Sequence, residues 1–438
     1  MNARAAAIQV LARVSATDAF LNVVLDAHLS ELRPGDARDA GLCTELCYGA
    51  TRRQLTLDHV LEQVSDRKLS ALEDRVLAAL RIGAYQVFYT RVPRHAAVGE
   101  TVEALKSLRL QRAAGFANAV LRKVAAMPEV PLPPESEPLR RLAVRESHPE
   151  WLVERWRRQY GPARAEQMLS ADNVPPPVVL RANRARASRA QLLEELAGAG
   201  LDARPTALAP AGILLGAPGR VEELLGYREG LWQVQDEAAQ LVVEYAGIPD
   251  GARVLDACAA PGGKACALAE RTRVIACDVH PNKLRKIESE AKRLGVHGRL
   301  EARAHDAEQP FPEAWGEFDA VLLDAPCSGL GTLRRHPELR YRRKPEDVGR
   351  LAALQSRLLE SCQAAVAPGG LLVYAVCSVD PQEGGDQVEL FLRSHPEFTA
   401  EPPASLPGGV PLAQGYLRTL PGPEGLDGFF AARLRRTY

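Results

Sequence analysis

Apolar residues recur at helical spacing through the first part of the chain. They are found at Ala7, Ile8, Leu11 and Val14, at Leu57, Val60, Leu61 and Val64, at Leu77, Leu80, Ile82, Ala84 and Val87, and at Val102, Leu105 and Leu108. Apolar residues three or four positions apart line one face of an α-helix, so residues 4 to about 126 predict a helical bundle. Breaks are expected at Pro34-Gly35 and at Pro93. The proline-rich stretch from Pro128 to Pro138 cannot carry a regular helix and predicts a linker.

The middle of the chain has a mixed pattern. Helices are predicted over 151–169 and 190–199, and strands over 178–183 and 212–215. This mixture predicts a small α/β subdomain that links the bundle to the rest of the chain.

From about residue 234 onward, short apolar runs alternate with helical patterns. The runs lie at 254–256, 274–277, 300–303, 320–323 and 371–374, and the helical patterns at 265–271, 282–294 and 351–366. Short apolar runs are typical of buried parallel strands, and their alternation with helices favours a doubly wound parallel sheet. The predicted fold is therefore multidomain, with a helical bundle over 1–130, an α/β linking subdomain over 140–233 and a Rossmann-like α/β domain over 234–438.

Composition excludes few classes of protein. The 438 residues are 46% hydrophobic and 25% charged, which is ordinary for a globular protein of two or three domains. Lys+Arg and Asp+Glu balance at 55 each, so a nucleic-acid site would have to be a local patch. No apolar run approaches the length of a membrane span, no signal peptide is visible, and eight cysteines in so long a chain do not indicate a disulfide scaffold. We expect a cytoplasmic protein with reduced thiols and no membrane association.

Two cysteines stand at the ends of predicted strands. One follows the run at 320–323 as Cys327, and the other follows the run at 371–374 as Cys377. Open α/β sheets bind ligands outside the carboxyl ends of their strands, so two thiols there predict a cofactor-dependent enzyme that forms a transient covalent bond to its substrate. The alternative is two buried cysteines that act as small hydrophobic residues.

Five of the other six cysteines are best interpreted as core or helix-face residues: Cys43, Cys47, Cys266, Cys277 and Cys362. Cys43 and Cys47 are four residues apart on a predicted helix, but no His or Cys partners stand at metal-ligand spacing, and no metal is predicted.

The segment from Asp256 to Lys264 joins the first predicted strand of the last domain to its helix. Gly262 and Gly263 permit a tight turn and a close approach of a ligand to the backbone. A Walker phosphate loop is excluded, because Cys258 replaces its first glycine and no Ser or Thr follows the lysine.

Acidic residues follow the next strands, at Asp278, Asp306 and Asp324. A carboxylate after the second strand suits hydrogen bonds to ribose hydroxyls. The alternative for each is an aspartate that caps a turn, and for Asp306 taken alone this alternative is favoured.

Several motifs, in this order, resemble the Nop2/Sun family of S-adenosylmethionine-dependent RNA cytosine-C5 methyltransferases. The matching segments are 256–264 (Asp-Ala-Cys-Ala-Ala-Pro-Gly-Gly-Lys), 324–329 (Asp-Ala-Pro-Cys-Ser-Gly), 334–337 (Arg-Arg-His-Pro), 374–378 (Tyr-Ala-Val-Cys-Ser), 427–433 and 233–240. The segments 48–52 and 116–123 resemble the NusB-like RNA-binding helical domain. That combination is characteristic of the branch of bacterial 16S rRNA methyltransferases B.

The resemblance implies the roles of individual residues. Cys377 would add to carbon 6 of cytosine, Cys327 would take part in release of the product, and Asp324 would hydrogen-bond the cytosine edge. The residues implied to bind S-adenosylmethionine are Cys258, Ala259, Ala260, Pro261, Gly262, Gly263, Lys264, Asp278, Asp306 and Asp324. Lys264 would hold the cofactor carboxylate or face the active site, with a surface lysine as the alternative.

The chain departs from the family pattern at two places near the second cysteine. Val376 replaces the usual Thr, and Gly384-Gly385 stand near the position of the usual Asn. The resemblance still implies transfer of a methyl group to cytosine 967 of 16S rRNA through a covalent cysteine adduct, with 16S rRNA as the partner. We expect the protein to be a monomer.

Two basic stretches are candidate phosphate contacts. The first comprises Arg91, Arg94, Lys106, Arg109, Arg112, Arg122 and Lys123, for which a solvated face is an equal alternative. The second comprises Arg334, Arg335, Arg340, Arg342, Arg343 and Lys344, which we expect to bind RNA phosphates beside the active site. Two other functions remain open: a DNA cytosine-C5 methyltransferase with Cys327 as nucleophile, and a non-catalytic RNA-binding assembly factor.

Overall fold

A computed structural model describes residues 2–29, 37–216, 219–423 and 425–437 and separates the chain into two compact units. Unit 1 comprises Met1–Pro175 and Leu333–Arg343, and unit 2 comprises Pro176–Thr332 and Lys344–Tyr438. The predicted break at Pro34-Gly35 lies outside the described residues. The break at Pro93 is confirmed, because one helix ends at Tyr89 and the next begins at Arg94. The predicted domain limits stay a prediction.

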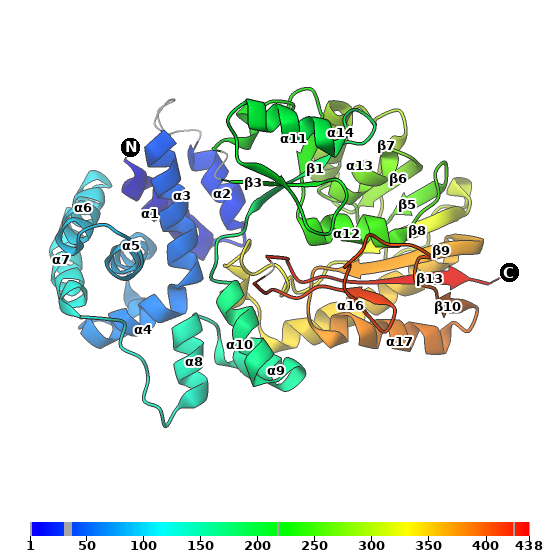
Figure 1. Ribbon diagram of the computed structural model, residues 1–438. Coiled ribbons are helices and arrows are strands. Elements are labelled where there is room, and N and C mark those ends of the chain that lie inside the picture. The colour runs from blue at the N-terminus through cyan, green and yellow to red at the C-terminus, as the bar shows by residue number, and fades with distance from the viewer. Residues whose placement is uncertain (1, 30–36, 217–218, 424, 438) are drawn as a thin grey trace. The chain divides into compact units, whose positions relative to one another are not determined.

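Unit 1 is helical throughout (Figure 1). Its helices are α1 (Ala3–Ala16), α2 (Leu21–Leu29), α3 (Ala37–Arg52), α4 (Gln54–Val64), α5 (Asp74–Tyr89), α6 (Arg94–Ser107), α7 (Gln111–Ala126), α8 (Pro138–Glu146), α9 (Glu150–Tyr160), α10 (Pro162–Ala171) and α15 (Leu339–Arg342). The predicted helical bundle is thus confirmed, and no helix or strand lies between Ala126 and Pro138, as expected of the proline-rich linker.

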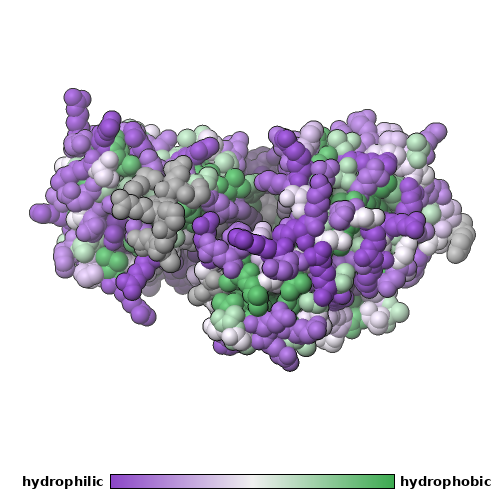
Figure 2. Space-filling view, turned by 90° about the horizontal axis from the view of Figure 1, so that it is seen from above, coloured by the Kyte–Doolittle hydropathy of each residue, from purple (hydrophilic) through white to green (hydrophobic). Residues whose placement is uncertain are grey.

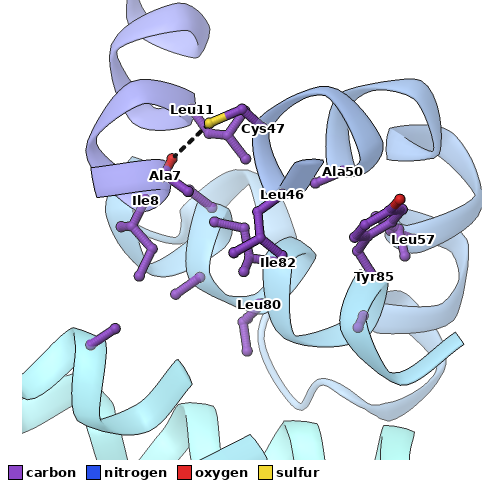
Figure 3. Packing of buried hydrophobic residues seen from close by; sticks show 14 of the residues in the cluster. Ala7, Ile8, Leu11, Leu46, Cys47, Ala50, Leu57, Leu80, Ile82 and Tyr85 are labelled. Atoms are coloured by element: carbon purple, nitrogen blue, oxygen red, sulfur yellow. Dashed lines mark hydrogen bonds between the residues drawn. The ribbon is translucent and has the colours of Figure 1, made fainter. Parts of the chain in front are cut away.

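The core of the bundle is formed by the apolar faces that the sequence pattern indicated. Ile8 and Leu11 of α1, Leu46 of α3 and Leu80 and Ile82 of α5 belong to one cluster of buried hydrophobic residues (Figure 3). Cys47 lies in the same core, with its thiol 4.0 Å from the carbonyl oxygen of Ala7, and Cys43 is fully buried beside it. Both cysteines are therefore core residues, as predicted.

One predicted helix, over 151–169, is divided in two. Helix α9 ends at Tyr160 and α10 begins at Pro162, with Gly161 between them at a φ of 77°. Proline lacks the amide proton that would continue a helix and disfavours the α conformation in the residue before it. Glycine then adopts the left-handed φ at little cost, so the chain turns there.

The predicted role of the second basic stretch is wrong for its central residues. Arg340 is 0% exposed and donates to the carbonyl oxygen of Arg52 (3.0 Å), the side chain of Asn173 (2.8 Å) and the carbonyl oxygen of Asp172 (2.5 Å). Arg342 donates to carbonyl oxygens around the end of α1, and Arg334 is buried. Backbone carbonyl groups of unit 1 therefore occupy guanidinium groups that we had expected to bind phosphates, and only Lys344 of this stretch is exposed.

Unit 2 contains two sheets. In the described residues the smaller sheet has the order β2-β3-β1-β4 and is antiparallel, with strands β1 (Val178–Ala182), β2 (Ala203–Pro205), β3 (Gly212–Leu215) and β4 (Trp232–Val234). Helix α11 (Arg189–Gly198) packs on it. These elements confirm the predicted α/β linking subdomain.

The larger sheet is nine-stranded in the described residues, with the order β11-β12-β13-β9-β8-β5-β6-β7 and with β10 paired to β13. Its strands are β5 (Arg253–Asp256), β6 (Arg273–Asp278), β7 (Leu300–Ala304), β8 (Phe318–Asp324), β9 (Val366–Val376), β10 (Phe398–Ala400), β11 (Leu412–Ala413), β12 (Tyr416–Arg418) and β13 (Phe430–Arg436). Strands β5 to β9 are parallel at the predicted positions, and β13 adds to β9 in the antiparallel direction.

Helices cover both faces of this sheet, as a doubly wound fold requires (Figure 1). On one face lie α12 (Glu237–Ala246), α13 (Gly263–Ala269) and α14 (Pro281–Leu294), and on the other α16 (Pro345–Ala364) and α17 (Gly385–Ser394). Alternate strand residues belong to the two apolar clusters: Val254, Ala320 and Val373 pack on the first face, and Leu255, Val321 and Leu372 on the second. The sheet therefore forms the buried centre of the unit.

Hydrophilic residues dominate the visible face of each unit (Figure 2). Among the described residues, no helix has both the length and the apolar character needed to cross a membrane.

We predict that Arg340→Ala lowers the free energy of unfolding of unit 1 by about 3 kcal/mol, because it leaves buried acceptors without donors. Denaturant unfolding of the full chain, followed by a probe in the bundle, measures this change. Arg112→Ala, which removes an exposed arginine of α7, is the matched control and should change the value by less than about 0.5 kcal/mol. Equal small effects would show that the buried guanidinium contributes nothing to stability.

Candidate active site

The two predicted thiols lie together at the carboxyl edge of the larger sheet. Strands β8 and β9 pair in parallel with Asp324 opposite Ala375, so the residues that follow leave the sheet side by side. The amide of Ala325 donates to the carbonyl oxygen of Ala375 at 2.9 Å. The sulfur atoms of Cys327 and Cys377 are 3.4 Å apart. The two cysteines at the predicted strand ends therefore lie side by side at one edge of the sheet.

The surroundings of Cys327 favour its protonated form. The hydrogen bond with Cys377 and burial both raise the pKa of the Cys327 thiol well above its usual value. A thiol that keeps its proton can donate it to a neighbouring sulfur, and such a bond stabilises a thiolate on the acceptor. The raised pKa of Cys327 therefore favours Cys327 as the donor in its contact with the Cys377 sulfur.

The loop between β5 and α13 is formed as the glycine pattern predicted. Gly262 has a φ of 107°, and a Cβ atom there would lie 3.2 Å from the side chain of Ile287. The amide of Ala259 donates to the carbonyl oxygen of Cys277 at 2.7 Å, which ties the loop to the end of β6. The loop thus lies against the carboxyl end of the strand that carries Asp278.

Lys264 faces the active site. Its ammonium group lies 2.6 Å from a carboxylate oxygen of Asp324 and 5.3 Å from the ring centre of Phe429. Burial lowers the pKa of Lys264, but the Asp324 carboxylate more than offsets this effect and the net pKa is raised. The alternative of a surface lysine is therefore wrong, and Lys264 and Asp324 form a charged pair beside the thiols.

Asp256, which sequence analysis treated only as the first residue of the loop, is 0% exposed at the end of β5. Neither of its carboxylate oxygens has a side-chain hydrogen-bond partner among the described residues, and the backbone of Cys258 lowers the pKa of Asp256 only in part. Burial and the nearby charge of Asp324 raise the pKa of Asp256 to about 8, against the opposing effect of Lys264. An unpaired buried carboxyl group beside a glycine loop fits a ligand that presents a cationic or hydrogen-bond-donating end, such as the amino-acid end of S-adenosylmethionine.

The two remaining acidic residues differ in their surroundings. Asp278 is buried at the end of β6, accepts from the amide of His280 at 2.8 Å and lies 3.7 Å from the ammonium of Lys283. Asp306 is exposed beyond the end of β7 and accepts from the amide of Glu308 at 3.0 Å. Asp306 therefore caps a turn, the alternative that sequence analysis favoured for it alone, and its contact with a cofactor stays a prediction.

The departures from the family pattern are accommodated by packing. Val376 is fully buried in the apolar cluster under α16 and α17. A Cβ atom at Gly384 would lie 3.1 Å from the ring of Phe430, so glycine lets that ring approach the backbone, whereas Gly385 has open space around it. Neither change disturbs the two thiols.

Sequence reasoning missed the polar residues behind the thiols. Glu383 and Gln355 are fully buried and contact the segments that carry Cys327 and Cys377. Glu383 directly precedes Gly384-Gly385, where the chain departs from the family pattern. Nothing in the spacing along the chain indicates that Glu383 meets Ser328, which lies 55 positions earlier.

Basic side chains of unit 1 remain accessible outside the buried stretch. All of the basic residues between Arg91 and Lys123 are exposed. Some of them have protein partners: Arg94 donates to carbonyl oxygens after α7, and Lys106 pairs with Glu103 at 2.7 Å. This patch fits either a phosphate contact or a solvated face.

Three sequence profiles match the chain. Residues 247–435 match the family described as 16S rRNA methyltransferase RsmB/F, residues 1–126 match the NusB family, and residues 148–222 match the ferredoxin-like domain of RsmF/B-like methyltransferases.

Similar proteins extend over the whole chain. The ribosomal RNA small subunit methyltransferase B of Vibrio cholerae is 36% identical over 100% of this chain and 98% of its own. The protein of the same name from Pseudomonas syringae pv. tomato is 38% identical over 99% and 97%. The solved structure described as "Crystal Structure of PH0851" has a TM-score of 0.86 and 25% identity, and covers 99% of this chain and 98% of that chain.

We predict that Asp256 makes stability fall as the pH rises from about 4 to about 8. The carboxyl group is protonated in the folded chain over this range because its pKa is about 8, whereas it is ionised in the unfolded chain. The folded state therefore binds one more proton, and the free energy of unfolding loses about 1.4 kcal/mol per pH unit from this group. Denaturant unfolding at several pH values should give a shallower decline for Asp256→Asn than for the unaltered protein; parallel curves would contradict the raised pKa.

Proposed function

We propose that this chain, which belongs to the family of bacterial ribosomal RNA small subunit methyltransferases B, methylates carbon 5 of a cytosine in 16S rRNA through a covalent cysteine adduct. Its family membership makes it an S-adenosylmethionine-dependent methyltransferase of small-subunit rRNA. The cytosine specificity, the proposed target cytosine 967 and the roles of individual residues go beyond that membership. A cytoplasmic monomer stays a prediction.

The observation that carries the proposal is the pair of thiols 3.4 Å apart beside the Lys264–Asp324 pair. Carbon 5 of cytosine is too weak a nucleophile to accept a methyl group unaided. Addition of the Cys377 thiolate to carbon 6 places electron density on carbon 5. After methylation, carbon 5 loses its proton, and the electron pair of that bond restores the ring double bond as the Cys377 sulfur leaves.

Cys327 suits the step that removes the proton. The hydrogen bond with Cys377, burial and the nearby charge of Cys377 all raise the pKa of the Cys327 thiol in the free chain. Once the Cys377 sulfur is bonded to carbon 6 it carries no charge and is a poorer acceptor, so the contributions of Cys377 disappear and that of burial remains. Formation of the adduct therefore makes Cys327 a better base than it is in the free chain.

Asp324 and Lys264 would stabilise the base during attack. A carboxylate at the end of β8 can accept a hydrogen bond from the amino group of cytosine, and the ammonium of Lys264 holds it at 2.6 Å. Both side chains stand on the edge of the sheet from which the thiols project, so they would contact the base on its pairing edge.

Bound S-adenosylmethionine supplies the electrophilic methyl group. The residues that would hold it are the loop from Cys258 to Lys264 and the carboxylates of Asp256 and Asp278. Gly262 permits close approach to the backbone, and buried Asp278 suits the ribose hydroxyls. A contribution of Asp306 is part of this proposal and rests on the family resemblance alone.

The proposal is tested by incubating the protein with labelled S-adenosylmethionine and unmethylated 16S rRNA, followed by mapping of the labelled nucleotide. Label at one cytosine, at carbon 5, supports the proposal. Label on duplex DNA alone would favour a DNA methyltransferase. If protein with bound cofactor transferred no methyl group to any RNA, the proposal would be wrong.

We predict opposite adduct behaviour for the two cysteine variants. Cys377→Ser should lower methyl transfer by more than about 1000-fold and form no protein–RNA adduct, because the attacking sulfur is lost. Cys327→Ala should still attack and methylate, and should then accumulate a protein–RNA adduct that survives denaturing gel electrophoresis. Adducts from Cys377→Ser and none from Cys327→Ala would reverse the assignment.

We predict that the exposed basic patch of unit 1 contributes to RNA affinity. Replacing Arg91, Arg112 and Arg122 by Ala should weaken binding of 16S rRNA and reduce the slope of log affinity against log salt by about 2, because fewer counterions are released. Affinity for S-adenosylmethionine should stay the same. The test uses substitutions and does not remove residues 1–175, because residues 333–343 pack on that part of the chain and would lose their partners.

The matched control replaces Arg271 and Arg273, exposed residues at the amino end of β6, on the sheet edge opposite the thiols. The control should leave the salt slope unchanged. An unchanged slope in the unit 1 variant would show that its basic patch is a solvated face.

A further inference from the structure

A buried carboxylate connects the two segments that carry the thiols. Glu383 lies in a short 3-10 turn, Pro381–Glu383, and is 0% exposed. One of its carboxylate oxygens accepts from the backbone amide of Ser328 at 2.7 Å. The other accepts from the hydroxyl groups of Ser328 and Ser378, the latter at 2.6 Å. Ser328 follows Cys327 and Ser378 follows Cys377, so one carboxylate holds the residue after each thiol.

Gln355 of α16 extends the same connection to the other side of Cys327. Its side-chain amide donates to Glu383 at 3.1 Å and to the carbonyl oxygen of Pro326 at 2.9 Å. The hydroxyl of Tyr374 in β9 donates to the Gln355 side chain at 3.1 Å and to the carbonyl oxygen of Glu383 at 2.5 Å. The peptide groups on both sides of Cys327 are thereby fixed to the strand that leads to Cys377.

The direction of these hydrogen bonds requires an acceptor at both oxygens of residue 383. Each serine hydroxyl also accepts a backbone amide, Ser378 from Asp380 at 3.1 Å and Ser328 from Leu330 at 3.4 Å. The two hydroxyls also lie 3.1 Å from each other, so each can donate to Glu383 or to the other serine. Glutamine at this position would keep an acceptor for the amide of Ser328 only by turning its NH₂ group toward the serine hydroxyls, which would then lose the acceptor they share.

We infer that Glu383 is a positioning residue that sets the separation and orientation of the two thiols for the methyl-transfer reaction. It acts through Ser328, Ser378 and Gln355 and does not touch the substrate. The inference rests on the proposed function for its kinetic consequence, while the thiol geometry itself is independent of any substrate. A displacement of reacting atoms by about 1 Å can cost about 100-fold in rate, which sets the size of the expected effect.

The test compares Glu383→Gln with Glu237→Gln. Glu237 is a buried carboxylate of the same unit that accepts from the amides of Leu208 and Ala209, at 2.6 and 2.9 Å, and it contacts neither thiol segment. Both variants lose acceptor capacity in the core and should show lowered melting temperatures. At a temperature where both are folded, Glu383→Gln should lower kcat about 100-fold with KM for RNA and cofactor within twofold, and Glu237→Gln should leave kcat within threefold.

A second readout needs no substrate. Diamide takes one hydrogen from each of two adjacent thiols, is itself reduced to the hydrazine and leaves a disulfide. Peptide mapping after a timed exposure measures the rate of pairing of Cys327 with Cys377. The rate should fall at least tenfold in Glu383→Gln and should not change in Glu237→Gln. Ser378→Ala, a milder change that removes one donor to Glu383 and the acceptor of the Asp380 amide, should shift kcat and the pairing rate in the same direction, and should add little when combined with Glu383→Gln.

The outcomes are separable. The inference would be overturned if Glu383→Gln kept a kcat and a pairing rate near those of the unaltered chain, and Glu383 would then have a role in stability alone. If Glu383→Gln did not fold, an unchanged kcat and pairing rate in Ser378→Ala would overturn the inference in the same way. If the unaltered protein methylated no RNA, the proposed function would fail, while the pairing rates would still decide whether Glu383 positions the thiols.

Discussion

The parallel pairing of β8 with β9 is the constraint on which the candidate site depends. With Asp324 opposite Ala375, both strands end at the same edge of the sheet, and the loops that follow must run side by side. The loops approach each other closely: the amide of Gly331 donates to the carbonyl oxygen of Cys377 at 3.1 Å, and that of Gly428 to Gly331 at 2.7 Å. A Cβ atom at Gly331 would lie 1.8 Å from the Gly428 carbonyl oxygen, so this contact admits only glycine there. Register and glycine together bring two distant cysteines within reach of each other.

Much of this framework could be predicted from the sequence, because strands buried on both faces leave a strong local signal. The runs that became β5 to β9 are short and apolar, and the segments between them show helical spacing, so their order implies a doubly wound sheet. The antiparallel strands β10 to β12 could not be found in this way, because each has only two or three residues. Strand β13 carries Arg433, Arg435 and Arg436, and these charged residues interrupt the apolar pattern that would indicate a buried strand.

The error over the second basic stretch has a physical cause. A run of arginines shows where positive charge lies along the chain, but its partners are determined by the fold. Arg340 found carbonyl oxygens and Asn173 in unit 1, where desolvation of a guanidinium is offset by directed hydrogen bonds. Glu383 illustrates the converse: an isolated glutamate in a turn sequence gives no local signal, because its donors come from β9, α16 and the loops after β8 and β9. Pattern predicts elements well, and it predicts the polar contacts between distant elements poorly.

Electrostatics in the site follow from an imbalance of charge in a buried space. Asp256 and Asp324 lie near one ammonium group, and Lys264 is committed to Asp324 at 2.6 Å. Asp256 therefore retains its proton to about pH 8, since a second charge without a partner would be costly in this environment. The family's cofactor carries positive charge at both its sulfonium and its amino group, so its arrival would favour ionisation of Asp256 and release a proton. A cation would supply the partner charge that Asp256 lacks, so the surroundings that keep Asp256 protonated favour a cationic ligand beside the glycine loop.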